Sequence, residues 1–392
     1  QAAIEADLRH VIYALSDALD LVGVDDVAHG KRVGIMAAEC ARTMGLGESE
    51  ISSLFDLGLL HDIGVSSTNT HRHLVGEFDW VGSQDHANVG QSLLAGFKPL
   101  AAMAEPIRYH HTRWDKLVAA GVDAQVIHQA NLILLVDRVD ALTAPYYATN
   151  SMLLHKDAIR EQVRGRAGSY FDPQLVEVFL EASKSEAFWL LLEPRSIQCY
   201  LQDMLARGER CMAGVDELKH LATIFSCIVD AKSPFTAEHS LGVARLSRLL
   251  AEKMGVSAIN CDKLEIAGLL HDLGKLRVPD EILDKPAKLD LEERMVINAH
   301  SFETFQILRN IEGFEEISRW AAYHHEEPDG TGYPFRLSAE AMPLEARILR
   351  VADIFQAMVQ DRPYRAGLDR AAVTGFMTEQ RARGFIDAEI TD

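Results

Sequence analysis

The chain has 392 residues, of which 48% are apolar and 25% are charged, the balance of an ordinary soluble globular protein. This length is enough for two or three domains that each have their own core. The net charge of −19 argues against a general binder of nucleic-acid polymers, because phosphate backbones need a basic face. A small anionic ligand is not excluded, since a binding site is set by its own lining.

Targeting and redox signals are few. No apolar run approaches the ~20 residues needed to cross a bilayer, and no signal peptide opens the chain. We therefore expect a cytoplasmic protein with no membrane segment, and, because the sequence opens with Gln1, a longer natural protein with an upstream segment. The cysteines are isolated and odd in number, as expected of thiols in a reducing compartment. They are Cys40, Cys199, Cys211, Cys227 and Cys261.

Helical periodicity dominates the first half of the chain. Residues 8–15 begin an amphipathic pattern, and residues 33–44 continue with small and apolar residues at helical spacing. Gly45 and Gly255 are stop signals at matching places in the two halves. Each precedes a helix that runs into a His-Asp pair, at residues 51–60 and 261–270.

The middle of the chain predicts a domain boundary. We expect a helix near residues 174–192, a break at 193–195, a connecting helix at 196–211 and a further helix at 215–231. Sustained alternation of apolar and polar residues is missing from the sequence, so little β-sheet is expected. The predicted fold is all-α, with two tandem helical bundles joined by a helical linker. The predicted domains are 1–195 and 215–392, with the linker at 196–214.

One pattern of histidines and aspartates occurs twice. The first His lies 32 residues before the His-Asp pair in both copies, and a lone His lies 24 residues before a His-His pair in both. Chance does not repeat seven residue types at such spacings, so the chain reads as an internal duplication. The second copy is His239, His271, Asp272, His300, His324, His325 and Asp353; the first is His29, His61, Asp62, His86, His110, His111 and Asp137.

This mixture of side chains predicts metal binding. Neutral imidazoles and carboxylates together suit first-row divalent metals such as Mn, Fe, Co, Ni or Zn. Seven ligands exceed the needs of one tetrahedral site, so two metals sharing the Asp of the His-Asp pair is the economical arrangement. Two metals roughly 3.5–4 Å apart are typical of phosphoester hydrolysis. Histidines outside the repeated pattern are expected to be ordinary surface or core residues, and His71 and His73 to lie in a loop.

Specific sequence motifs contain or follow the candidate ligands of the second copy. They are, in chain order, His271-Asp272-Leu273-Gly274-Lys275, Val278-Pro279-Asp280-Glu281-Ile282-Leu283, Lys285-Pro286-Ala287-Lys288-Leu289, His324-His325-Glu326-Glu327-Pro328-Asp329-Gly330-Thr331-Gly332-Tyr333-Pro334 and Asp361-Arg362-Pro363-Tyr364-Arg365. Over about residues 215–390 the chain resembles the HD-GYP family, a branch of the HD metal-dependent phosphohydrolases. The resemblance implies an HD-type helical bundle that hydrolyses bacterial cyclic dinucleotides at a di- or trinuclear centre, often of iron or manganese.

The resemblance also implies residue roles. The seven residues of the second copy would be metal ligands, with Asp272 bridging two ions. Lys275 would touch the scissile phosphate, and Arg362 and Arg365 would contact the substrate. The loop that carries Tyr333 would shape the pocket wall or a partner surface. Family members with three metals carry a Glu where this chain has Phe235, so two metals are expected, with Fe or Mn preferred and Ni, Co or Zn as alternatives.

The first copy resembles degenerate members of the same family. It keeps its seven candidate ligands, but Val65 stands in the place of Lys275, and Gly-Tyr-Pro is missing after His110-His111. Ala144-Pro145-Tyr146-Tyr147 replaces the stretch with both arginines. We favour packing on the second domain and regulation as its role; metal or nucleotide binding without turnover and hydrolysis of another substrate are alternatives. Homodimerisation through such a packed face is a further alternative.

The predicted function is hydrolysis of a cyclic dinucleotide to a linear dinucleotide with a 5′ phosphate, then to mononucleotides. Cyclic di-GMP and 3′,3′-cyclic GMP-AMP are both candidate substrates, and the sequence does not separate them. Two alternatives stay open. One is a non-catalytic cyclic dinucleotide receptor, against which Lys275 counts. The other is an HD hydrolase of another nucleotide, against which Tyr333, Arg362 and Arg365 count.

Overall fold

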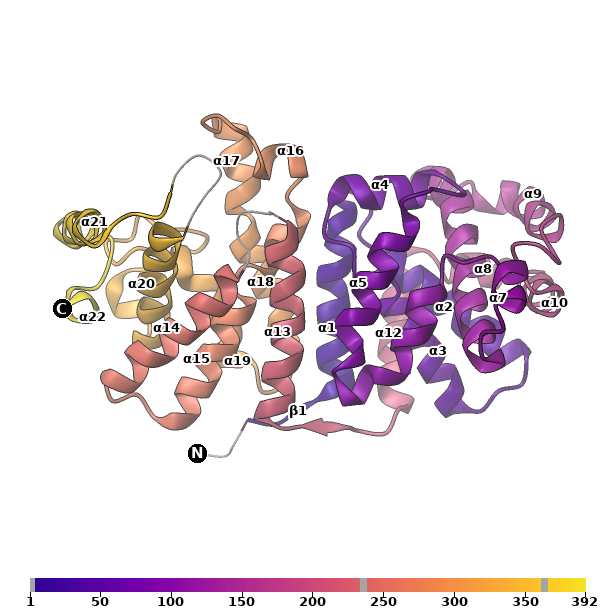
Figure 1. Ribbon diagram of the computed structural model, residues 1–392, viewed down its shortest axis with the longest axis horizontal. Helices are drawn as coiled ribbons and strands as arrows, with labels where there is room; N and C mark the ends of the chain where they lie inside the picture. Colours follow the sequence, from indigo (N-terminus) through magenta and orange to yellow (C-terminus); the bar gives the residue numbers. More distant parts are fainter. Residues whose placement is uncertain (1–3, 233–237, 361–365) are drawn as a thin grey trace. The chain divides into compact units, whose positions relative to one another are not determined.

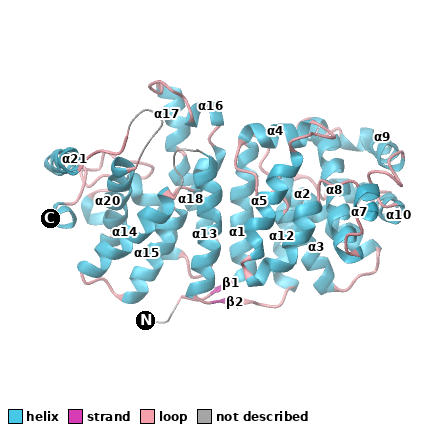
Figure 2. Cartoon of the chain, in the orientation of Figure 1, coloured by secondary structure: helices cyan, strands magenta, loops and turns pink. Residues whose placement is uncertain are grey.

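The computed structural model describes residues 4–232, 238–360 and 366–392 (Figure 1). These residues form helices joined by loops, as Figure 2 shows, which confirms the expected all-α class. Strand structure in the described part is limited to β1 (Ala6–Asp7) and β2 (Met212–Ala213), an antiparallel pair with Ala6 opposite Ala213. Within the described ranges, every helix is too short or too polar to traverse a bilayer.

The chain divides into two compact units. Unit 1 comprises the segment up to Val24, residues 66–68 and residues 210–392; unit 2 comprises residues 25–65 and 69–209. The observed division differs from the expected one, because the first helix groups with the second half of the chain. That helix, α1 (Leu8–Asp20), buries Val11, Ile12 and Leu15 and packs on α18 (His300–Leu308). Its apolar face follows from its sequence, but the helix that covers it lies far along the chain.

Unit 2 is built around the pair of helices that carries the first His-Asp motif. Helix α2 (His29–Thr43) packs on α3 (Glu48–Leu60) and α8 (Ala124–Tyr147). A Cβ on Gly58 would lie 2.5 Å from the Cα of Gly34, so α2 and α3 approach closely where both residues are glycine. The other helices of this unit, with α4 beginning at its boundary, are α4 (Thr68–Gly76), α5 (Ser83–Ala95), η2 (Lys98–Met103), α6 (Ala104–Tyr109), α7 (Trp114–Ala119), α9 (Met152–Arg164), α10 (Pro173–Ala182), α11 (Glu186–Leu190) and α12 (Pro194–Arg207).

Unit 1 repeats the arrangement. Helix α14 (His239–Lys253) packs between α15 (Ala258–Leu270) and α20 (Leu344–Val359), as α2 does between α3 and α8 (Figure 1). Both α3 and α15 follow a glycine with positive φ, Gly45 and Gly255, at the expected stops. The remaining helices are η1 (Leu21–Gly23), α13 (Val215–Lys232), η3 (Leu273–Arg277), α16 (Asp280–Leu283), α17 (Leu291–Asn298), α19 (Glu315–Ala322), η4 (Tyr323–His325), η5 (Ala339–Ala341), α21 (Arg370–Ala382) and α22 (Ala388–Thr391).

Three local expectations were wrong. The single helix expected at 174–192 is two helices, α10 and α11, and between them the carbonyl of Ser183 accepts a hydrogen bond from Trp189 Nε1 at 3.0 Å. The connecting helix ends at Arg207, and β2 follows it, because residues 212–213 pair with β1. His71 and His73 lie on α4, not in a loop.

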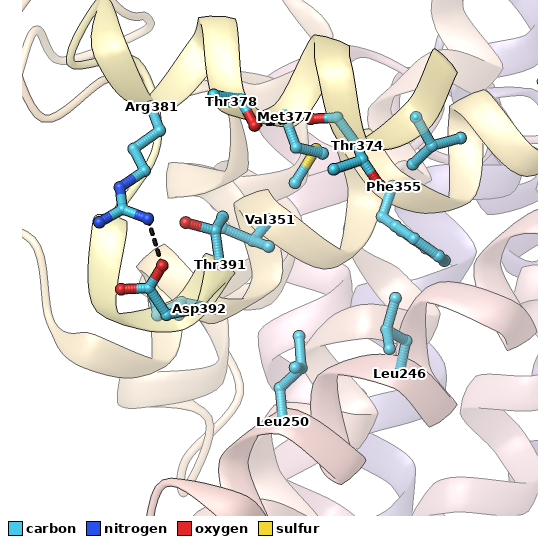
Figure 3. A pocket seen from close by; sticks show the side chains of 12 residues that line it. Leu246, Leu250, Val351, Phe355, Thr374, Met377, Thr378, Arg381, Thr391 and Asp392 are labelled. Atoms are coloured by element: carbon cyan, nitrogen blue, oxygen red, sulfur yellow. Dashed lines mark hydrogen bonds and ion pairs between the residues drawn. The ribbon is translucent and has the colours of Figure 1, made fainter. Parts of the chain in front are cut away.

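Unit 1 also holds an apolar cavity of about 460 Å³ between α14, α20, α21 and α22 (Figure 3). Leu246, Leu250 and Phe355 line one side, and an ion pair between Arg381 and Asp392 lies at its edge. The lining also includes Thr374, Thr378 and Thr391, and it does not include the repeated histidines.

Candidate metal centres

Unit 1 brings together all seven residues of the second copy. His239 and His300 begin α14 and α18, His271 and Asp272 follow the end of α15, and Asp353 lies on α20; His324 and His325 lie in η4. Their ligand atoms form overlapping groups in which all atoms lie within 4.8 Å of one another: His239, His271 and Asp353; His271, Asp272 and His324; His300, His324 and His325.

Asp272 stands between two half-sites. Its Oδ1 lies 3.3 Å from His300 Nε2 and 3.6 Å from His324 Nε2, while its Oδ2 lies 3.4 Å from His271 Nε2. On the other side, Asp353 Oδ1 lies 3.0 Å from His239 Nε2 and 3.6 Å from His271 Nε2. Oδ1 of Asp272 therefore faces His300 and His324 while Oδ2 faces His271, an arrangement that suits a bridging carboxylate.

The histidine rings are oriented by backbone carbonyls. The Nδ1 atoms of His271, His300 and His324 lie 2.7, 2.6 and 2.6 Å from the carbonyl oxygens of Gly268, Ile297 and Ala321. This contact fixes Nδ1 as the protonated nitrogen and leaves Nε2 facing the centre, as in histidines that bind metals. The buried atoms His271 Nε2 and Asp272 Oδ1 have no hydrogen-bond partner. These residues therefore fit a pair of divalent ions, which would satisfy both atoms.

The electrostatics agree with metal binding. Burial lowers the pKa of His324 to about 4, which keeps its imidazole neutral at physiological pH. Burial alone would raise the pKa of Asp272, but His271 and Lys275 hold that pKa well below its ordinary value. Burial likewise opposes protonation of His271, yet Asp272 and Asp353 raise the pKa of this imidazole to about 9. An incoming cation would therefore displace a proton from His271.

The centre opens into a cavity of about 620 Å³. Its polar lining includes Lys275, whose Nζ lies 2.7 Å from Asp272 Oδ2. Its apolar lining includes Leu283, the last residue of the motif at 278–283, and Met358 and Phe376, which sequence reasoning did not single out. A lining that combines charged and apolar side chains suits a ligand with both phosphates and bases.

Unit 2 assembles the first copy in the same way. Asp62 Oδ1 lies 3.2 Å from His86 Nε2 and 3.7 Å from His110 Nε2, and its Oδ2 lies 3.3 Å from His61 Nε2. His29 Nε2 lies 3.3 Å from Asp137 Oδ1. The two groups of ligand atoms are Asp62, His86, His110 and His111, and His29, His61 and Asp137. This centre also fits a divalent pair, since the buried Nε2 atoms of His29 and His61 lack hydrogen-bond partners.

The two centres differ in the residue and in the cavity that lie beside their candidate ligands. Val65 is buried where the second copy has Lys275. The cavity beside His111 has a volume of about 10 Å³, room for little more than a water molecule.

Comparisons with known proteins agree with this duplication. HD domain models match residues 27–145 and 223–390. The 3'3'-cGAMP-specific phosphodiesterase 1 of Vibrio cholerae is 37% identical over 98% of this chain and 90% of its own length. The chain belongs to the HD-GYP family.

Other HD-GYP relatives match all or part of the chain. The crystal structure of a cyclic GMP-AMP specific phosphodiesterase of Vibrio cholerae, V-cGAP3, has a TM-score of 0.67 and 25% identity, and the match covers 99% of this chain and 96% of that one. The cyclic di-GMP phosphodiesterase response regulator RpfG of Xanthomonas campestris is 38% identical over 47% of this chain and 50% of its own length.

The Gly-Tyr-Pro loop of this HD-GYP chain packs tightly beside the second centre. A Cβ on Gly332 would lie 2.3 Å from the backbone nitrogen of Glu327. The Tyr333 ring stacks on His325, with centroids 4.8 Å apart and an interplanar angle of 19°. Tyr333 lines the cavity as expected. Arg362, Arg365 and Phe235 lie outside the described residues.

Proposed function

We propose that unit 1 is a metal-dependent phosphodiesterase that opens a cyclic dinucleotide to a linear dinucleotide with a 5′ phosphate, and then cuts this product to mononucleotides. The observation that carries the proposal is the position of Asp272, which faces two histidine groups and Lys275 at the wall of an open cavity. The printed activities of the relatives, cyclic GMP-AMP and cyclic di-GMP hydrolysis, support it.

The seven residues of the second copy would hold two divalent transition ions, with Fe or Mn preferred and Ni, Co or Zn as alternatives. When bound, such a pair supplies Lewis acidity to a phosphodiester and lowers the pKa of water. Lys275 places an ammonium group where negative charge grows on the phosphoryl oxygens. The stack of Tyr333 on His325 holds this imidazole in position and forms part of the substrate wall.

The substrate assignment rests on the mixture of charged and apolar residues that line the cavity, and on the relatives. Phosphates would face Lys275, and bases would lie against the apolar residues around Met358 and Phe376. Arg362 and Arg365 would contact phosphate by bidentate hydrogen bonds. We place 3′,3′-cyclic GMP-AMP before cyclic di-GMP, because the relative that matches along nearly the whole chain is specific for the former.

One assay tests the proposal. Purified full chain, loaded with Mn²⁺ or Fe²⁺, is offered cyclic di-GMP, 3′,3′-cyclic GMP-AMP and several linear nucleotides, and the products are resolved by chromatography. Appearance of a linear 5′-phosphorylated dinucleotide supports the proposal. Binding of cyclic dinucleotide without turnover would indicate a receptor, and turnover of linear nucleotides alone would indicate another HD hydrolase. Light scattering of the same sample tests the homodimer.

A further inference from the structure

Arg138 ties a candidate ligand of the first copy to the segment beside it. Its Nη2 donates to Asp137 Oδ2 at 2.8 Å and to the carbonyl oxygen of Leu74 at 2.7 Å. Its Nη1 donates to the carbonyl oxygens of Glu77 and Phe78 at 2.7 and 3.2 Å. One buried guanidinium thus joins Asp137 to three carbonyls at the end of α4 and just after it.

The segment that Arg138 holds lies against the first centre. Leu74, Glu77 and Phe78 line the same small cavity as His111. On α4, the ring of His71 is buried and meets the ring of His29 edge-on, with centroids 5.7 Å apart. The side chains of the candidate ligands are almost fully covered in both copies: Asp62 is 14% exposed and the others of the first copy no more than 6%, while Asp353 of the second copy is 14% exposed and Asp272 5%. The first centre is closed by comparison with the second because the cavity beside His111 has a volume of about 10 Å³, against about 620 Å³ beside Asp272.

The second copy lacks this arginine. Asp137 and Asp353 are the equivalent aspartates, and the next residue is Arg138 in one copy and Ile354 in the other. Ile354 lines the 620 Å³ cavity and offers no donor to a neighbouring segment. The closed first centre and the open second centre thus differ in the residue that follows the equivalent aspartate, Arg138 in one and Ile354 in the other.

A second buried network fixes His29. Its Nδ1 lies 2.8 Å from Asp140 Oδ2, and Asp140 Oδ1 accepts hydrogen bonds from Arg32 Nε at 2.7 Å and from the Tyr147 hydroxyl at 2.5 Å. Arg32 also bonds both oxygens of Asp26, at 2.9 and 2.6 Å. A carboxylate behind a ligating imidazole fixes its orientation and raises its basicity. At the matching place the second copy has Gln356, an uncharged amide.

We propose that the first copy is a sealed metal site with a structural role, closed by Arg138 and made rigid by Asp140. Its ions stabilise unit 2 and exchange slowly, because Arg138 holds the covering segment onto Asp137. Closure leaves no room for a dinucleotide beside His111, so the site keeps its ligands without turning over that substrate. Structural sites with a filled ligand shell contribute their binding free energy to folding.

Release of metal to a chelator tests this proposal in the full chain. The protein is loaded with Mn²⁺, mixed with excess EDTA, and sampled for protein-bound metal and for its thermal unfolding temperature. We expect two phases in the wild type, a fast one from the second copy and a slow one from the first. H271A/D272A should remove the fast phase, and H61A/D62A should remove the slow phase.

The positioning residues give a finer test. In the H271A/D272A background, R138I should speed metal release at least tenfold, since it places the second copy's residue in the first. D140N should weaken Mn²⁺ affinity by about 10- to 100-fold, as loss of a partner behind a ligand does. The control is D26N, which removes the charge of the carboxylate that pairs with Arg32 but does not contact His29. Because Asp26 is 47% exposed, D26N should change the Mn²⁺ affinity far less than D140N does.

Three results would overturn the proposal. They are an absence of metal in the first copy of loaded protein, a single fast phase in the wild type, and a thermal unfolding temperature that is unchanged when the slow phase is complete. The last two use wild-type protein, so the test does not depend on whether R138I or D140N folds.

Discussion

Lys275 Nζ lies 2.7 Å from Asp272 Oδ2, so a positive charge is ion-paired with the carboxylate that lies between the two histidine groups of the second centre. The side chain of Lys275 is 28% exposed and borders the open cavity, whereas Val65, its counterpart, is buried. Two nearly identical ligand sets therefore differ in whether a cation can reach a bound phosphate.

Replacing this lysine should separate catalysis from metal binding. In K275M, turnover of cyclic dinucleotide should fall about 100- to 1000-fold, the usual effect of removing one group that stabilises transition-state charge. The metal content should stay at the wild-type level, because the seven ligands are intact. Steady-state kinetics and metal analysis measure both. K285M is the matched control, since Lys285 is bonded to Glu293, and it should retain activity. Wild-type turnover in K275M would contradict the role.

Gly274 sets the distance between the His-Asp loop and α18. A Cβ at this position would lie 2.0 Å from the carbonyl oxygen of His300, so G274A must move a candidate metal ligand. We expect a loss of at least about 1–3 kcal/mol in the free energy of unfolding, as overpacking produces, together with weaker metal binding. G375A is the control, because nothing lies within 4 Å of its new methyl group on α21, and it should be neutral or stabilising by up to about 1 kcal/mol. Urea unfolding measures both; equal stability of the two variants would refute the packing argument.

The buried ammonium group of Lys232 should make the free energy of unfolding depend on pH. Its side chain is fully buried, with Nζ 3.1 Å from Asp280 Oδ1 and 3.1 Å from the carbonyl oxygen of Ser66. Burial lowers its pKa below the ordinary value of 10.5, although Asp280 acts in the opposite direction. The unfolded chain therefore binds this proton more tightly than the folded one. The free-energy cost of burying the charged ammonium disappears as the pH rises toward the pKa of Lys232 in the unfolded chain.

The difference in unfolding free energy between wild type and K232M should consequently shift in favour of the wild type from about pH 7 to about pH 10. K232M lacks the titrating group, so the other ionisable residues cancel in this difference. Chemical denaturation at several pH values measures it. A constant or opposite trend would show that Lys232 is not desolvated in the fold.

Sequence reasoning succeeded where the information was local or repeated. The duplicated spacing identified two sets of seven residues, and each set converges in the structure; their role as metal ligands stays a prediction. The positive-φ glycines Gly45 and Gly255 fell where helices were expected to stop, because such a backbone conformation favours glycine. Helices α3 and α15 end where they were expected to, at Leu60 and Leu270, but they begin at Glu48 and Ala258, earlier than the expected residues 51 and 261.

What the sequence did not reveal depends on contacts between distant segments. Nothing near Arg138 shows that its guanidinium reaches the carbonyl oxygens of Leu74 and Glu77. His71 and His73 were expected in a loop but lie on α4; its threonines and histidines lack apolar periodicity, and the helix packs through the buried residues Leu74 and His71. The grouping of α1 with the second half likewise depends on which helix covers its apolar face.

The most direct test of the account compares the two His-Asp pairs as double alanine variants of the full chain, assayed for cyclic dinucleotide hydrolysis with Mn²⁺ and checked for folding by circular dichroism. H271A/D272A should abolish turnover, and H61A/D62A should leave substantial activity. Equal loss from both folded variants, or activity that survives in H271A/D272A, would contradict the assignment of the chemistry to the second copy.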